Sequence, residues 1–238
     1  MTRLLVSVRD VPEALLAAGG GADFIDLKEP RDGALGGLAL ETIAAVVAAL
    51  RERAIGLPVS ATIGDLGMDQ LAAILARVQA VAACGVDYVK VGIERAPGAG
   101  AVLDALATCG PAVVPVFIAD RGLDAALLRR ACDSSFPALM VDTADKLAGS
   151  LFDVMALPDL QRFVDTVRSS GALAGVAGAL RLPHLPALAR LQPDFAGFRT
   201  AVCSGSRSGA LDRQRLQALA AQLHDTALAP VAVSVPVA

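Results

Sequence analysis

Lysine is scarce in this chain, and the positions of its few lysines are the first clue to chemistry. The 238-residue sequence contains 21 lysines and arginines together, and only three of them are lysines: Lys28, Lys90 and Lys146. Arginine therefore serves the general surface role, and the lysines need a specific explanation. A buried lysine amine can attack a carbonyl carbon and form a Schiff base, which assists the making or breaking of a carbon–carbon bond. A second lysine can move protons in the same reaction.

Two aspartates accompany these lysines. Asp26 is two residues from Lys28, so both side chains are expected on the same face of a strand. Asp142 precedes Lys146 by four residues. A carboxylate beside an amine can orient it or act as a general acid or base. The simpler interpretation, in which these aspartates only form ion pairs that hold the lysines, stays open at this stage.

Short apolar runs alternate with helical patterns rich in alanine and leucine. We expect strands at 4–8, 24–28, 59–63, 88–92, 113–118, 138–142, 173–176 and 195–200. We expect helices at 11–19, 39–54, 68–84, 98–109, 122–133, 145–170, 183–191 and 209–224. Strands that alternate with helices form a parallel sheet, and eight such units in one domain favour a closed barrel. The sequence therefore predicts an α/β fold, a single (β/α)8 TIM barrel at 1–225 that forms the catalytic domain, followed by an apolar tail at 226–238.

Such a barrel would gather the lysines at one end. Lys28 and Lys90 lie at the ends of the second and fourth expected strands, and Lys146 follows the sixth. The C-terminal ends of barrel strands form the catalytic face, and inward side chains of alternate strands share one interior layer. We therefore expect Lys28 and Lys90 to approach each other inside this open end, with Lys146 reaching in from its loop.

The last two strands carry candidate phosphate-binding residues. In TIM barrels the loops after the seventh and eighth strands frequently bind phosphate. Glycine lets backbone N–H groups approach an oxyanion, and arginine adds a fixed positive charge. The expected phosphate-binding residues are Gly175, Gly178, Arg199 and Thr200. Gly205, Arg207 and Gly209 follow before the last helix.

Composition excludes several other classes of function. The net charge of −3 argues against a nucleic acid or membrane-surface partner, because both need clustered positive charge. No apolar run is long enough for a signal peptide or a membrane span, so we expect a cytoplasmic protein. The four cysteines and two histidines form no zinc-ligand pattern, and no GxGxxG motif follows the first strand. We therefore expect no metal and no cofactor. The apolar tail suggests a loose extension or an oligomer contact, and we expect a homo-oligomer.

Four motifs carry a resemblance to a known family. The segment LLVSVRDVPEALLAAGGGADFIDLKEPRDGALG, at Leu4 to Gly36, resembles the start of the (5-formylfuran-3-yl)methyl phosphate synthases, the furan-forming enzymes of methanofuran biosynthesis. Shorter matches are YVKVG at Tyr88–Gly92, the DT…K segment of Asp142, Thr143 and Lys146, and GFRTAVC at Gly197–Cys203. The resemblance covers about 1–220. The chain departs from the family pattern at Arg9, where the pattern has proline, and at Glu29, where it has asparagine.

The resemblance implies a lyase that condenses two molecules of glyceraldehyde 3-phosphate, with loss of phosphate and water, to the furan aldehyde phosphate. It also implies that Lys28 forms the Schiff base and that Lys90 accepts a proton. Asp26, Asp142 and Lys146 would complete the site. The family further implies a bacterial or archaeal one-carbon pathway with methanofuran-type carriers.

Two alternatives remain at this stage. A different class I aldolase on another sugar phosphate would need the same imine lysine and the same phosphate loops. A non-catalytic barrel that binds a sugar phosphate as a sensor or scaffold is the other alternative. The presence of both Lys28 and Lys90 argues against it.

Overall fold

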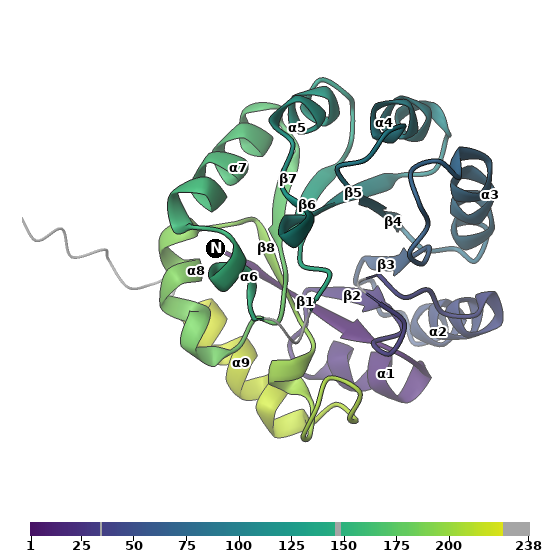
Figure 1. The fold of residues 1–238 in the computed structure, drawn as a ribbon. Helices are drawn as coiled ribbons and strands as arrows, with labels where there is room; N and C mark the ends of the chain where they lie inside the picture. Colours follow the sequence, from purple (N-terminus) through teal and green to yellow (C-terminus); the bar gives the residue numbers. More distant parts are fainter. Residues whose placement is uncertain (34, 146–148, 226–238) are drawn as a thin grey trace, which may run out of the picture.

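The chain forms a closed barrel of eight parallel strands that follow one another in sequence order (Figure 1). A computed structural model describes residues 1–33, 35–145 and 149–225. The barrel closes where the first strand pairs with the last. The strands are β1 (Arg3–Val8), β2 (Phe24–Leu27), β3 (Val59–Thr62), β4 (Tyr88–Ile93), β5 (Val113–Ile118), β6 (Ala138–Asp142), β7 (Leu173–Val176) and β8 (Phe195–Phe198). The predicted (β/α)8 fold is confirmed, and every predicted strand is present with ends within two residues.

Helices surround the barrel on its outer side (Figure 1). The α-helices are α1 (Val11–Gly19), α2 (Leu40–Glu52), α3 (Leu71–Ala82), α4 (Ala99–Thr108), α5 (Ala125–Cys132), α6 (Leu151–Val154), α7 (Leu157–Ser169), α8 (Leu185–Leu191) and α9 (Arg213–Asp225). Three short 3-10 helices are η1 (Ala119–Arg121), η2 (Leu182–His184) and η3 (Thr200–Val202). None of these helices in the described residues is both long and apolar enough to cross a membrane.

The helix predicted over 145–170 is wrong as one element, because two helices share this segment. Met155 and Ala156 both have extended backbone, with ψ of 127° and 145°, and separate α6 from α7. Pro158 lies in the first turn of α7, where a missing N–H is tolerated because it would have no partner within the helix. The proline therefore begins a helix here and does not continue one.

Two hydrophobic layers support the barrel. The larger layer lies between the strands and the helices. A smaller cluster fills the interior and includes Leu5, Val114, Val116, Met140 and Phe195. Charged and hydroxyl side chains are buried beside this inner cluster: Asp26, Lys28, Ser60, Thr62, Lys90 and Asp142. Because burial of such groups is costly unless they are paired, their partners define the candidate site.

At the opposite, N-terminal end of the barrel, three aspartate side chains link neighbouring strands by hydrogen bonds. Asp23, Asp87 and Asp194 immediately precede β2, β4 and β8. Each carboxylate accepts a backbone N–H of the preceding strand, from Leu4 at 2.6 Å, Val59 at 2.7 Å and Ala174 at 2.8 Å respectively. These bonds satisfy donors at the starts of the strands, so the aspartates stabilise the barrel away from the lysines.

Candidate active site

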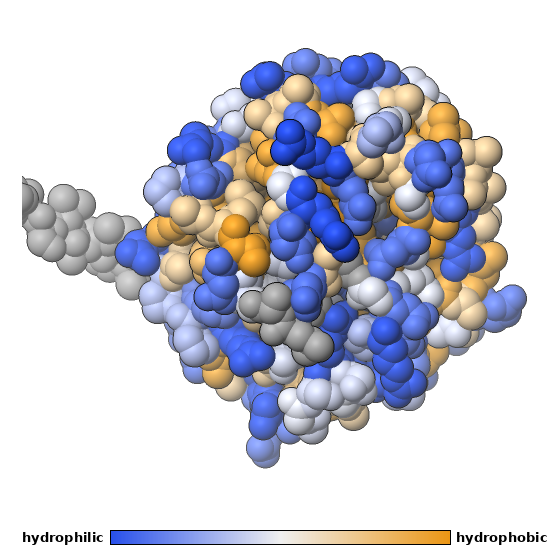
Figure 2. Space-filling view, in the orientation of Figure 1, coloured by the Kyte–Doolittle hydropathy of each residue, from blue (hydrophilic) through white to orange (hydrophobic). Residues whose placement is uncertain are grey.

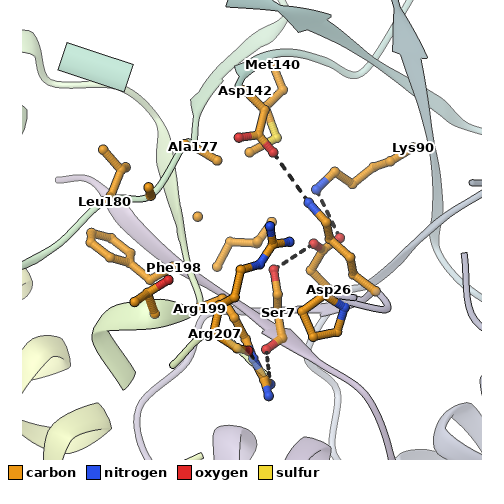
Figure 3. Close-up of a pocket in the computed structure, with 17 residues that line it drawn as sticks. Ser7, Asp26, Lys90, Met140, Asp142, Ala177, Leu180, Phe198, Arg199 and Arg207 are labelled. Carbon is orange, nitrogen blue, oxygen red and sulfur yellow. Dashed lines mark hydrogen bonds and ion pairs between the residues drawn. The ribbon is translucent and has the colours of Figure 1, made fainter. Parts of the chain in front are cut away.

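An open pocket lies at the C-terminal ends of the strands, with about 550 Å³ of empty space when the open solvent at its mouth is included. On the face seen in Figure 1, hydrophilic side chains gather across the middle of the barrel end (Figure 2). The cavity is lined by Lys28, Lys90, Asp26 and Asp142 on one side and by residues of the β7 and β8 ends on the other (Figure 3). The small residues Ala177, Gly178 and Gly197 occupy that second side and leave room opposite the amines.

The second strand delivers one lysine and one aspartate to this cavity. Asp26 lies within β2, and Lys28 follows its last residue. The backbone N–H of Lys28 donates to the carbonyl of Val8 at 3.0 Å, so the chain remains paired with β1 at this point. Both side chains line the cavity, as the two-residue spacing predicts. Residue exposure is only 1% for Asp26 and 7% for Lys28.

Asp26 receives three hydrogen bonds from three neighbouring strands. Lys90 Nζ lies 3.0 Å from Asp26 Oδ1. The hydroxyl of Ser60 donates to the same oxygen at 2.7 Å, and the hydroxyl of Ser7 donates to Oδ2 at 3.0 Å. These bonds fix the positions of the Asp26 carboxylate and of the Lys90 amine.

Lys28 pairs with an aspartate of a different strand. Its Nζ lies 3.5 Å from Oδ2 of Asp142, the last residue of β6 (Figure 3). Asp142 Oδ1 also accepts the backbone N–H of Thr143 at 2.8 Å. The strand order places β2 and β6 on opposite sides of the barrel, so this pair spans its open end. Lys28 and Lys90 therefore each have a carboxylate partner. The arrangement is compatible with aspartates that hold the lysines in place by ion pairs. Lys146 lies outside the described residues, as does the tail at 226–238.

The candidate phosphate residues fall into two groups. Gly178, with φ of +124°, and Thr200, at the start of η3, both line the cavity. Gly175 lies within β7 and does not line it. A Cβ at Gly175 would lie 2.1 Å from the ring of Phe195, so this glycine is required for packing of that ring. The structure gives Gly175 a role in the barrel core and not in a phosphate loop.

Arg199 lines the cavity, but its guanidinium is directed to acceptors of the protein itself. It forms a bidentate pair with Glu13, at 2.5 Å from Nη1 and 3.0 Å from Nη2. It also donates to three backbone carbonyls, those of Ser7, Arg207 and Gly209. A guanidinium has five N–H donors, and these bonds occupy all of them. Arg199 is therefore a structural cation as it stands here.

Arg207 was noted in the sequence after the eighth strand but was not among the expected phosphate-binding residues. It lies in the loop between η3 and α9, it is half-buried, and it lines the cavity. Burial lowers the pKa of the Arg207 guanidinium, and the nearby Asp142 carboxylate opposes that effect. The sequence showed an arginine between two glycines, but only the folded loop reveals that its side chain faces the lysines.

Thiol and metal chemistry have little support in this cavity. Cys203 is fully buried, and burial raises the pKa of its thiol, which favours the unreactive protonated form. Within residues 1–33, 35–145 and 149–225, no group of three or more His, Cys, Asp or Glu side chains could hold a metal ion. The chemistry available from these side chains is that of amines, carboxylates and hydroxyls.

Sequence comparisons point to one family. The model of the 4-HFC-P synthase family matches residues 4–220. A protein of Methylorubrum extorquens, whose name carries (5-formylfuran-3-yl)methyl phosphate synthase as a provisional assignment, is 41% identical over 215 residues, which is 90% of this chain and 88% of that protein. The (5-formylfuran-3-yl)methyl phosphate synthase of Archaeoglobus fulgidus is 33% identical, over 93% of this chain and 99% of its own. The enzyme of the same name from Methanosarcina mazei is 32% identical, over 92% and 98%.

Solved structures support the fold alone. Phosphoribosyl anthranilate isomerase from Thermococcus kodakaraensis superposes with a TM-score of 0.64 at 18% identity, over 94% of this chain and 100% of that one. 3-Hexulose-6-phosphate synthase from Salmonella typhimurium gives a TM-score of 0.60 at 20% identity, with the same coverage of 94% and 100%. At such low identity the resemblance establishes only a common barrel fold. It gives no information on the reaction of this chain.

Proposed function

Because the chain belongs to the 4-HFC-P synthase family, we propose that it condenses two molecules of glyceraldehyde 3-phosphate to (5-formylfuran-3-yl)methyl phosphate. One phosphate and two molecules of water are lost, and the product serves methanofuran biosynthesis. The reaction is a lyase reaction in which carbon–oxygen bonds break. The observation that carries the proposal is the pair of buried lysines, each beside its own aspartate, in one cavity.

Lys28 is the residue that forms the Schiff base. Its distance of 3.5 Å from Asp142 is longer than the 3.0 Å of the Lys90–Asp26 pair, and its side chain is twice as exposed, 8% against 4%. An amine that attacks a carbonyl must give up a proton and leave its ion pair. The looser pair at the cavity surface therefore supports Lys28, and the Asp142 carboxylate is the acceptor for that proton.

Lys90 moves protons between the substrate and the buried network below it. Once the imine has formed, a proton leaves the neighbouring carbon, and the resulting enamine attacks the aldehyde carbon of the second molecule. A positioned acid or base close to that carbon accelerates such transfers. The Lys90 amine is supported by Asp26, Ser60 and Ser7 in a fixed arrangement, which suits repeated uptake and release of a proton.

The phosphate groups are bound by the β7 and β8 ends of the cavity. Gly178 lines this end of the cavity, and Thr200 offers a hydroxyl and the start of a helical turn. Backbone N–H groups in such turns are common phosphate ligands. This arrangement puts the phosphate opposite the amines, so that the aldehyde end of the substrate points toward Lys28.

The test is incubation of the purified protein with glyceraldehyde 3-phosphate as the only substrate. We expect a rise in furan absorbance together with release of one inorganic phosphate for each furan formed. A Lys28→Ala variant should lose both signals, whereas Arg130→Ala, which changes an exposed pair with Asp104 on the outer helices, should keep both. Aldol cleavage or condensation products without furan would favour the class I aldolase. Binding without turnover would favour the non-catalytic barrel.

A further inference from the structure

We propose that Arg207 binds the phosphate group of the substrate, and that Glu13 positions Arg207 through the two arginines with which it pairs. The proposal rests on the proposed function for the identity of the ligand, a phosphorylated aldehyde. It assigns the anion contact to a residue that follows η3. It also gives a role to Arg9, at which the chain departs from the family pattern.

The side chain of Arg207 is directed to the cavity and not to the protein. In the part of the chain that the structure describes, no residue accepts a hydrogen bond from its guanidinium, although the residue is half-buried and lines the cavity. Arg199, the other arginine of this wall, is fully engaged with Glu13 and backbone carbonyls. A partly buried guanidinium with open donors is the preferred partner of a phosphate group, which it can bind in a bidentate manner.

The loop that carries Arg207 is held through three successive carbonyl groups. Arg199 Nε donates to the carbonyl of Arg207 at 2.9 Å, and Arg199 Nη2 donates to that of Gly209 at 2.7 Å. Arg9 Nη1 donates to the carbonyl between them, that of Ser208, at 2.8 Å. These three bonds fix the backbone on the C-terminal side of the Arg207 Cα, which limits the directions available to its side chain.

Glu13 is the centre of this arrangement. Its carboxylate binds Arg199 through two bonds and Arg9 through Oε1, at 2.6 Å from Nη2. The residue is 5% exposed. Burial raises the pKa of Glu13, but the hydrogen bonds from Arg199 and Arg9 outweigh it, so the pKa is lowered overall and the carboxylate stays charged. Without that charge two guanidinium groups would be buried side by side with no counter-ion.

The local sequence explains why Glu13 reaches the open end of the barrel. Helix α1 begins after β1, and Asp10 caps it by accepting the backbone N–H of Glu13 at 2.9 Å. Glu13, in the first turn, accepts the backbone N–H of Arg9 in return at 3.0 Å. The bond to Arg9, the residue before the cap, turns the glutamate side chain back toward the start of the helix. In a barrel, that end of the helix faces the catalytic side.

The first arm of the test concerns the ligand of Arg207. Arg207→Ala should raise KM for glyceraldehyde 3-phosphate by roughly 10- to 100-fold, the usual effect of losing a charged hydrogen bond to a ligand. The inhibition constant for inorganic phosphate should rise by a similar factor, and added guanidinium chloride should recover part of the loss. Glyceraldehyde carries no phosphate, so borohydride trapping of glyceraldehyde should be as efficient in Arg207→Ala as in the wild-type protein. An unchanged KM and an unchanged inhibition constant would overturn the assignment.

The second arm asks whether Glu13 acts through Arg207. Glu13→Gln should raise KM several-fold in the wild-type background and should add nothing further in the Arg207→Ala background. Full additivity of the two changes would overturn the positioning role. Asp104→Asn is the matched control, because it neutralises the carboxylate of an exposed pair with Arg130 and should leave KM unchanged. If Glu13→Gln does not fold, Arg9→Ala, which removes the bond to Ser208, replaces it in the same comparison.

The two proposals can fail separately. If the wild-type protein forms no furan from glyceraldehyde 3-phosphate, the proposed function fails, whatever the variants do. If the wild-type protein forms furan and Arg207→Ala has the wild-type KM, only the present inference fails.

Discussion

Lys28 pairs with Asp142 across the open end of the barrel, at 3.5 Å, and not with Asp26 on its own strand. Asp26 is instead paired with Lys90 at 3.0 Å. This exchange of partners gives the two amines different surroundings. Lys28 lies 3.5 Å from its carboxylate partner, whereas Lys90 is part of a buried network with Asp26 and two serine hydroxyls.

Lys90→Arg tests the acid–base role. The variant keeps the positive charge beside Asp26, but a guanidinium does not give up its proton near neutral pH. We expect kcat for furan formation to fall by at least about 100-fold, the lower range for loss of a general acid or base. The Lys90 side chain is only 4% exposed, so the larger arginine could disturb packing. The melting temperature of the variant must therefore be measured as well. A folded variant with near-normal kcat would remove Lys90 from proton transfer.

Asp26→Asn tests the cost of the buried pair. The change leaves the Lys90 ammonium buried without its counter-ion, and we expect a loss of unfolding free energy of about 3–5 kcal/mol in urea. The double variant Asp26→Asn/Lys90→Met removes both charges and should recover part of that stability. If the single variant is as stable as the wild type, the pair contributes little to the fold.

The pH dependence of stability tests Glu13. Its pKa in the folded protein is lowered from the usual 4.5, so its stabilising effect is complete above that value and is lost as the pH falls through the folded pKa. The difference in unfolding free energy between wild type and Glu13→Gln should therefore be constant from pH 7 to pH 5.5 and shrink below about pH 4.5. A difference that does not change with pH would contradict the charged state of Glu13.

Asp194→Ala tests whether stability and activity reside at opposite ends of the barrel. The variant leaves the backbone N–H of Ala174 without its acceptor and removes a pair with Arg168. We expect a loss of about 1–3 kcal/mol in unfolding free energy, the cost of an unsatisfied buried donor. At temperatures where the variant is folded, kcat and KM should match the wild type. A large change in kcat would show that the two ends are coupled.

The elements of the fold could be predicted because each carries a local signal. Apolar runs of four to six residues between helical patterns located all eight strands. Lys28 and Lys90 were located by the same reasoning, since a strand end fixes the side of the barrel, whereas the prediction for Lys146 falls outside the described residues. The split between α6 and α7 was missed because a helical hydrophobic pattern continues through Ala156, and Pro158 was compatible with either interpretation.

The roles of Gly175 and Arg199 could not be predicted, because their partners are distant in the sequence. Gly175 makes room for Phe195, which pairs with it from the next strand. Arg199 is paired with Glu13, 186 residues away on the first helix. A glycine or arginine near a strand end indicates a phosphate site only when its donors are open to the cavity. That property depends on tertiary packing and not on spacing.

The most direct measurement is the site of borohydride trapping. The protein should be incubated with glyceraldehyde 3-phosphate, reduced with borohydride, digested and analysed by mass spectrometry. We predict one reduced triose phosphate adduct on Lys28, retained in a folded Lys90→Met variant and absent from Lys28→Ala. An adduct on Lys90, or furan formation with no adduct on Lys28, would contradict this prediction.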